Sequence, residues 1–171
     1  MAKRTAVIDL GSNSMRMAIF EKTSRYAFHI IGEFKMKVRL GEGAYEHGGE
    51  IAQKSMQKAC EALSEFKNIA QNYKCSKIFA MGTSALRDAP NADKLISMAR
   101  KELGINLKVV SGKDEATFGG VAALNLIEPL EEFVTLDIGG GSAELALVSG
   151  GKIIDAVSLN LGTVRLKELF F

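Results

Sequence analysis

Two aspartates, each followed by a turn of small residues, carry the pattern in this sequence that is best suited to chemistry on phosphate. The first turn spans Asp9–Ser14 and the second spans Asp137–Ser142, and apolar stretches flank both. Backbone N–H groups in a turn of glycine, serine and asparagine can converge on an anion, and a carboxylate beside the turn can hold a hydrated cation. We therefore interpret both stretches as phosphate-binding hairpins.

The two hairpins are copies of one pattern, separated by 128 residues. Apolar residues also coincide between the copies, so the chain contains an internal repeat. Two such hairpins that face each other would form a cleft with two turns and two aspartates on its walls. The identical pairs are Asp9 and Asp137, Gly11 and Gly139, Ser14 and Ser142, and Ala18 and Ala146.

The composition is that of an ordinary globular chain, with 171 residues of which 47% are hydrophobic and 25% charged. This length is sufficient for one domain and part of another. No apolar run is long enough to span a bilayer, and residues 1–4 lead into a strand rather than a signal peptide. We expect a cytoplasmic protein without a membrane partner, in which Cys60 and Cys75 form neither a disulfide nor a metal site.

Positive charge is concentrated near the first turn. Residues 1–40 contain eight Lys and Arg against three Asp and Glu, a net charge of +5, whereas the remainder has fourteen against seventeen, a net charge of −3. This distribution favours an anionic ligand at the first hairpin. Lys35, Lys37 and Arg39 alternate along one expected strand and so share a face. That face is either a solvated edge or a stripe that contacts a polyanion.

Hydrophobic periodicity predicts an α/β chain of two similar units. The first unit, 1–128, has the order β-β-β-α-β-α-β-α, and the second, 129–171, begins that order again. We interpret 129–171 as a truncated second copy, whose sheet would expose an apolar face unless it packs on the first unit or on another chain in a homodimer. The expected strands are 4–9, 14–21, 26–38, 76–81, 107–110, 133–137, 143–149 and 152–158, and the expected helices are 51–73, 91–103, 114–126 and 162–170.

Four motifs in this order resemble the Ppx/GppA family of exopolyphosphatases and guanosine pentaphosphate phosphohydrolases, and the resemblance extends over the whole chain. It implies an actin-like ATPase fold of the ribonuclease H-like type. It also implies a metal-dependent hydrolase that releases terminal phosphate from inorganic polyphosphate or guanosine pentaphosphate, as in the stringent response. The motifs are Asp9–Ser14, Gly82–Arg87, Ser111–Ala116 and Asp137–Glu144.

The resemblance also implies roles for individual residues. The catalytic glutamate of the family falls on Glu115, and the carboxylates linked to Mg²⁺ or Mn²⁺ fall on Asp137 and Glu144. The residues expected to bind phosphate are Asp9, Gly11, Ser12, Asn13, Ser14, Arg87, Gly139, Gly140, Gly141 and Ser142.

Elementary chemistry is consistent with these roles but leaves alternatives open. Glu115 can accept a proton from an attacking water. Its place near a helix N-terminus lowers its pKa, so burial must oppose that effect if Glu115 is to be an effective base. Equally, Glu115 could be a first-turn acid favoured by the helix dipole, and Arg87 could pair with Asp88 or a surface acid. The glycines of the second turn let the backbone approach a ligand and adopt positive φ where required.

Two other functions use the same residues. An actin-like sugar or acetate kinase would bind ATP on the two turns, and a non-catalytic module would hold polyphosphate or an alarmone on the basic first unit. We expect no DNA or RNA duplex as partner. Because half of the cleft wall is missing from a truncated second copy, we expect weak or no activity from these 171 residues alone.

Overall fold

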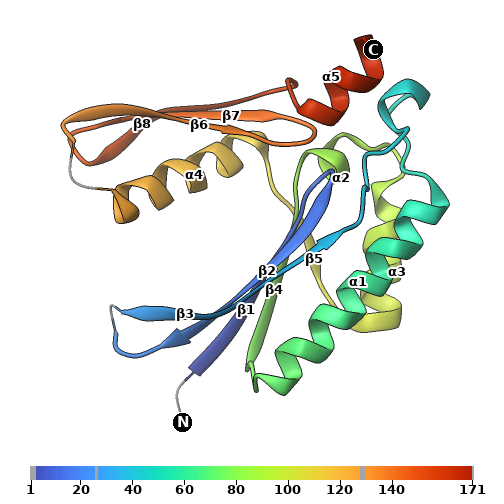
Figure 1. Cartoon of the computed structure of the whole chain (residues 1–171), viewed down its shortest axis with the longest axis horizontal. Helices are drawn as coiled ribbons and strands as arrows, with labels where there is room; N and C mark the ends of the chain where they lie inside the picture. Colours follow the sequence, from blue (N-terminus) through green and yellow to red (C-terminus); the bar gives the residue numbers. More distant parts are fainter. Residues whose placement is uncertain (1–2, 26, 128–129, 171) are drawn as a thin grey trace.

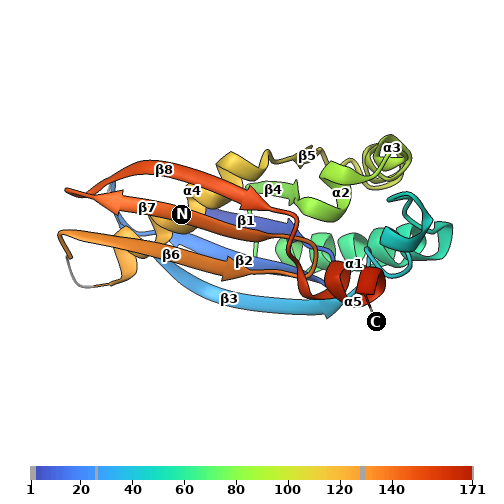
Figure 2. The same ribbon diagram turned by 90° about the horizontal axis from the view of Figure 1, so that it is seen from above.

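Two β-sheets form the framework of the computed structural model, which describes residues 3–25, 27–127 and 130–170 (Figure 1). The first sheet has the strand order β3-β2-β1-β4-β5 and the second has the order β6-β7-β8. Helices α1 and α3 lie side by side against one face of the first sheet, and α4 lies on the side of the second sheet that faces the first (Figure 1). Seen from above, the second sheet lies across the first (Figure 2).

The first sheet is built around β1, whose alternate residues are buried. Ala6, Ile8 and Leu10 are completely buried, as expected for one face of a strand packed on helices. β1 pairs antiparallel with β2 and parallel with β4. The strands are β1 (Lys3–Leu10), β2 (Ser14–Lys22), β3 (Phe28–Lys37), β4 (Lys77–Gly82) and β5 (Leu107–Val109).

Two amphipathic helices cover that buried face. Met56, Leu63 and Phe66 are spaced for one face of α1 (Gln53–Asn72), and all three are buried. The helix α3 (Ala92–Leu103) ends at Gly104, which takes the left-handed conformation typical of a helix terminus. Cys60 and Cys75 are both free thiols. Over the described ranges, no helix is at once long and apolar enough to cross a membrane.

The second sheet is covered by α4 on one face only. Ala146 and Ala156 form a small core with Ala116 of the helix. On the other face Val134 and Leu136 are 58% and 61% exposed, so the open apolar face predicted from the sequence is present. Homodimer formation through this face stays a prediction. The elements are α4 (Gly112–Leu126), β6 (Glu132–Ile138), β7 (Ala143–Ser149), β8 (Lys152–Leu159) and α5 (Thr163–Phe170).

The structure departs from the expected elements in three ways. A short helix α2 (Ser84–Asp88) and a 3₁₀ turn η1 (Tyr45–His47) were not predicted, because one turn of helix is too short to show a period. The placement of Arg39 on a strand was wrong, since β3 ends at Lys37 and Arg39 has φ of 52°. The cause is a pair of hydrogen bonds, because the Val38 and Arg39 N–H groups both donate to the Asn13 carbonyl.

Two expected boundaries cannot be compared with the structure. The first of these is the predicted start of the third strand at Tyr26, and the second is the unit boundary between Glu128 and Pro129. Both positions fall outside the described residues.

Adjacent glycines in α4 test the packing of this helix on the second sheet. A Cβ on Gly120 would lie 2.6 Å from Ile153 Cδ1 and 3.0 Å from Ala146 Cβ, whereas one on Gly119 would meet nothing within 4 Å. Gly119→Ala should therefore stabilise the fold by about 1 kcal/mol through helix propensity. Gly120→Ala should be less stable than Gly119→Ala by about 1–3 kcal/mol because of overpacking. Urea unfolding of both variants measures the difference, and equal stabilities would contradict this packing.

Candidate active site

The two Asp-containing turns have the same local geometry and lie at one end of the two sheets. The Gly11 N–H donates to the Ser14 carbonyl at 3.1 Å, and the Gly139 N–H donates to the Ser142 carbonyl at 2.9 Å. Both turns lie near α2 and α5 (Figures 1 and 2). The repeat seen in the sequence is therefore a repeat of hydrogen-bonded structure.

The turns face one another across a cleft of about 370 Å³. Arg16 and Lys35 contribute positive charge to its walls, and Thr83, Ser84 and Thr163 contribute hydroxyl groups. Of the residues singled out from the sequence, all except Arg87 and Gly141 line this cleft. Those that do are Asp9, Gly11, Ser12, Asn13, Ser14, Glu115, Asp137, Gly139, Gly140, Ser142 and Glu144.

Glycines allow the second turn to pack directly on the first unit. A Cβ on Gly141 would collide with the hydroxyl oxygens of Ser12, Tyr45 and Ser84. These hydroxyls already contact one another, with 2.9 Å between the Oγ atoms of Ser12 and Ser84 and 3.4 Å from Ser12 Oγ to the Tyr45 hydroxyl. A Cβ on Gly140 would lie 3.2 Å from Ser12 Cβ.

This packing corrects the expected role of the glycine run. None of the residues 139–141 adopts a positive φ, so left-handed backbone is not the reason for glycine there. At Gly140 and Gly141 the reason is space, because a side chain at either position would push the two turns apart. Gly141 accordingly lies against the hydroxyl cluster rather than on the cleft wall, and its contact with phosphate stays a prediction.

Carboxylates from four elements meet in the cleft. Asp9, Asp137, Glu144 and Glu115 come from β1, β6, β7 and α4. Removal from bulk water raises the pKa of Asp9 above its usual value, Arg16 opposes that rise, and the negative charges of Asp137 and Glu144 add to it. Glu144 is only 5% exposed, and its Oε1 accepts a hydrogen bond from Ser158 Oγ at 2.7 Å.

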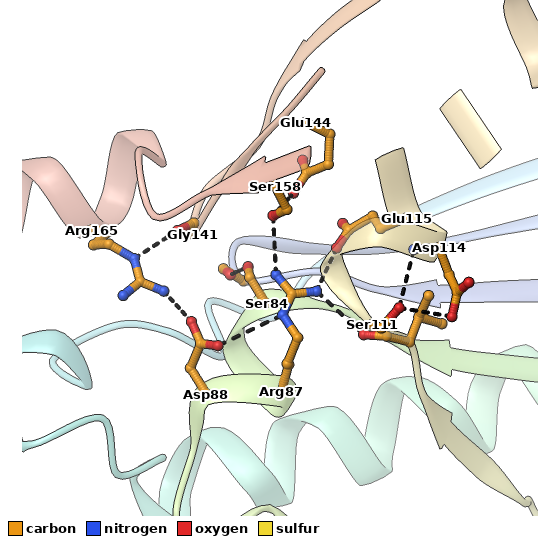
Figure 3. Close-up of polar contacts among 12 residues, drawn as sticks. Ser84, Arg87, Asp88, Ser111, Asp114, Glu115, Gly141, Glu144, Ser158 and Arg165 are labelled. Atoms are coloured by element: carbon orange, nitrogen blue, oxygen red, sulfur yellow. Dashed lines mark hydrogen bonds and ion pairs between the residues drawn. The ribbon is translucent and has the colours of Figure 1, made fainter. Parts of the chain in front are cut away.

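Glu115 lies in the first turn of α4 and pairs with Arg87 from α2 (Figure 3). Arg87 Nη1 lies 2.7 Å from Glu115 Oε2, and Arg87 also donates to the Val110 carbonyl at 3.3 Å. The Arg87 side chain is 19% exposed. It therefore holds Glu115 at the cleft wall. The contact of Arg87 with phosphate stays a prediction.

Burial of Glu115 outweighs the attraction of its partner. Desolvation raises the pKa of Glu115, the hydrogen bond and charge of Arg87 lower it, and the charges of Glu144 and Asp9 raise it further. Glu115 also borders an adjoining cavity of about 540 Å³ whose walls include Val110 and Phe118. Burial thus raises the pKa of Glu115, as anticipated from the sequence, but the group that opposes this rise is Arg87.

The donor set suits a hard cation that is shared with a phosphate ligand. Within the described ranges, no group of three or more His, Cys, Asp or Glu side chains is arranged to hold a metal by itself. Mg²⁺ is commonly bound by one or two carboxylates together with water and phosphate oxygens. Asp137 and Glu144 sit opposite one another on β6 and β7 and provide such a pair at the cleft wall.

Several residues at this site were missed from the sequence. Ser158 on β8 contacts both Glu144 and Arg87, the latter at 3.5 Å, and Tyr45 and Arg165 contact the second turn from outside the cleft. Isolated Ser, Tyr and Arg residues carry no local motif. Only the register of β8 against β7, where Ser158 lies opposite Glu144, could have pointed to one of them.

This architecture is that of the actin-like ATPase fold. The structure resembles EutJ from Carboxydothermus hydrogenoformans, with a TM-score of 0.56 at 15% identity over 97% of this chain and 55% of that one. The chain belongs to the Ppx/GppA phosphatase family, whose model matches residues 5–171.

Closer relatives lie within this family. The Aquifex aeolicus PPX-GPPA enzyme has a TM-score of 0.84 at 30% identity, over 100% of this chain and 56% of that chain. A Cytophaga hutchinsonii exopolyphosphatase has a TM-score of 0.88 at 31% identity, over 98% and 54%.

Two curated relatives carry different names. One is the guanosine-5'-triphosphate,3'-diphosphate pyrophosphatase of Photobacterium profundum, 32% identical over 97% of this chain and 33% of that protein. The other is exopolyphosphatase 1 of Mycobacterium leprae, 32% identical over 95% of this chain and 48% of that protein. The chain therefore spans between a third and a half of the length of these relatives.

The charges around Glu115 predict its titration. In the wild-type chain the Glu115 carboxyl should titrate above the ordinary glutamate value of about 4.3. Arg87→Gln should raise this pKa further because a charge-assisted hydrogen bond is lost, and Glu144→Gln should lower it because a like charge is lost. Carboxyl ¹³C NMR measures all three midpoints. A fall in the pKa of Glu115 in Arg87→Gln would show that the assigned electrostatics are incorrect.

Proposed function

We propose that the protein is a phosphoric anhydride hydrolase that releases terminal phosphate from inorganic polyphosphate or guanosine pentaphosphate. The observation that carries this proposal is the convergence of the two Asp-containing turns and Glu115 on one cleft. Phosphoryl transfer needs positioned donors for the phosphate oxygens and an oriented nucleophile, with little covalent chemistry from the protein. The cleft contains candidates for each.

The turns are the proposed phosphate cradle. Ser12 and Asn13 of the first turn line the same cleft as Gly139 and Gly140 of the second, so backbone N–H groups from both turns are available to one phosphate chain. Arg16 and Lys35 on the neighbouring strands add positive charge. The phosphate chain is therefore bound mainly by backbone dipoles, supported by two cationic side chains.

Glu115 is the proposed general base. The pKa of Glu115 is raised toward neutral pH, which makes its carboxylate a stronger proton acceptor. Arg87 keeps this carboxylate ionised and oriented. Glu115 takes a proton from the attacking water, and Arg87 holds the carboxylate at the cleft wall. In this proposal Arg87 acts through Glu115, and the contact with phosphate that the family resemblance implies for Arg87 is tested separately from it.

Asp137 and Glu144 are the proposed ligands of Mg²⁺ or Mn²⁺. A divalent cation bound there supplies charge neutralisation for the phosphate oxygens. The need for it follows from the site itself, because four carboxylates line a cleft proposed to bind a polyanion. The Ser158 hydroxyl fixes the orientation of Glu144.

The family match favours hydrolysis over the sugar or acetate kinase alternative. The two substrates are kept together in the proposal because the curated relatives carry names of both kinds. The non-catalytic alternative, a module that binds polyphosphate or an alarmone, differs in having no turnover. Replacement of the proposed base separates binding from turnover.

Glu115→Gln should abolish phosphate release while binding is retained. Loss of a general base lowers kcat by about 10²–10⁴-fold, and the neutral amide leaves both turns intact. Phosphate release from polyphosphate and guanosine pentaphosphate by the full-length protein, together with calorimetric Kd values, measures both effects. Asp114→Asn is the matched control, since Asp114 is on the same helical turn but contacts Ser111 at 2.8 Å outside the cleft. Unchanged turnover in Glu115→Gln would remove Glu115 from the mechanism.

Cation removal gives a second test. Chelation with EDTA should stop phosphate release, and added Mg²⁺ should restore it. Asp137→Asn should raise the Mg²⁺ concentration needed for half-maximal activity, because one of two anionic ligands is lost. Full activity of the chelated wild-type protein would rule out the proposed cation site.

A further inference from the structure

Arg165, in the first turn of α5, contacts three groups from different parts of the chain, two of which, Gly141 and Asp88, are shown in Figure 3. Its Nε donates to the Gly141 carbonyl at 2.7 Å, and its Nη2 donates to Asp88 Oδ2. The guanidinium carbon lies 4.4 Å from the centre of the Tyr45 ring. The side chain is only 12% exposed, and Arg165 is not among the residues that line the cleft.

Asp88 continues this set of contacts toward the proposed base. Its carboxylate, which accepts from Arg165, also lies 3.7 Å from Arg87 Nε, and the Nη1 of Arg87 holds Glu115. Figure 3 shows the resulting sequence of side chains, Arg165, Asp88, Arg87 and Glu115. A chain of alternating charges thus joins the carbonyl of the second turn to Glu115.

A neighbouring residue of α5 strengthens this arrangement. Glu168, one turn further along the helix, accepts hydrogen bonds from the backbone N–H groups of Gly43 at 2.8 Å and Tyr45 at 3.2 Å. The Tyr45 hydroxyl in turn belongs to the cluster against which Gly141 packs. Helix α5 therefore holds the second turn and the 41–45 segment as one body.

We propose that Arg165 is a positioning residue for the phosphohydrolase reaction, because its guanidinium ties the second phosphate turn, through Asp88 and Arg87, to Glu115. This inference rests on the proposed function. It assigns a role to a residue that neither lines the proposed phosphate cleft nor contacts the proposed metal ligands.

Arginine is required here by geometry and not only by charge. A planar guanidinium can donate to a carbonyl and a carboxylate along different edges while its face stacks on an aromatic ring. Lysine has one compact ammonium and cannot satisfy all three contacts. Arg165→Lys should therefore keep the ion pair with Asp88 but fail to restore the wild-type rate.

The test compares Arg165→Gln, Arg165→Lys and Asp88→Asn in the full-length protein with a matched control, Arg4→Gln. Arg4 donates to Glu21 at 2.7 Å and to the Tyr73 carbonyl at 3.0 Å, so it has the same types of contact as Arg165 but lies away from the cleft. Two quantities are measured. They are kcat and KM for phosphate release, and amide hydrogen exchange in residues 139–142.

Arg165→Gln and Asp88→Asn should each lower kcat by about ten- to a hundredfold, as for other residues that orient a reacting group. The double variant should lose less than the product of the two effects, since both act along one path. Exchange in residues 139–142 should accelerate in the Arg165 variants. Arg4→Gln should match the wild type in kcat and in that exchange.

The outcomes separate this inference from the proposed function. No phosphate release by the wild-type protein would overturn the proposed function and this inference with it. An active wild type with unchanged kcat in Arg165→Gln would overturn the inference alone, even if exchange accelerates, because the contacts would then be structural only. If Arg165→Gln does not fold, Arg165→Lys and Asp88→Asn carry the same test, and wild-type kcat in both would overturn it.

Discussion

The contact between a glycine backbone and a cluster of hydroxyl groups sets the geometry of the whole site. Gly141 packs so closely on Ser12, Tyr45 and Ser84 that a Cβ at this position would collide with their hydroxyl groups, and Gly140 packs on the first turn. These hydroxyls come from the first hairpin, from η1 and from the start of α2. The spacing of the two phosphate turns therefore depends on a packing contact in which one added methyl group would separate them.

A second consequence of this contact is electrostatic. Bringing the hairpins together places Asp9, Asp137 and Glu144 in one cleft. Besides desolvation, the charges of Asp137 and Glu144 raise the pKa of Asp9, and the charges of Glu144 and Asp9 raise the pKa of Glu115. Such repulsion disfavours the bare site and favours ligands that bring a cation with them. Arg87 offsets part of the repulsion at Glu115. The repulsion between carboxylates is therefore greatest in the cleft, where the proposed cation would neutralise it.

Much of the fold and of the cleft could be predicted from the sequence because the signals are local or repeated. The alternation in β1, the helical period of α1 and the 128-residue offset of the two turns are visible without coordinates. The contacts that Gly141 and Arg87 make could not be predicted from the sequence in the same way. Both depend on which side chains from distant elements surround them, and a local motif does not contain that information.

Long-range contacts account for the other residues that the sequence did not reveal. Ser158 meets Glu144 only through the register of β7 and β8, and Arg165 meets Asp88 across 77 positions of chain. Arg39 left its expected strand because of hydrogen bonds to Asn13. Each case involves a tertiary contact that overrides or adds to a local pattern, and each lies at or beside the cleft.

The most direct measurement is an NMR titration with inorganic tripolyphosphate in the presence of Mg²⁺. If opposed turns bind one phosphate chain, the backbone amides of Gly11–Ser14 and Gly139–Ser142 should shift together and saturate at a common ligand concentration. Shifts confined to one turn, or two turns that saturate at different concentrations, would contradict the account.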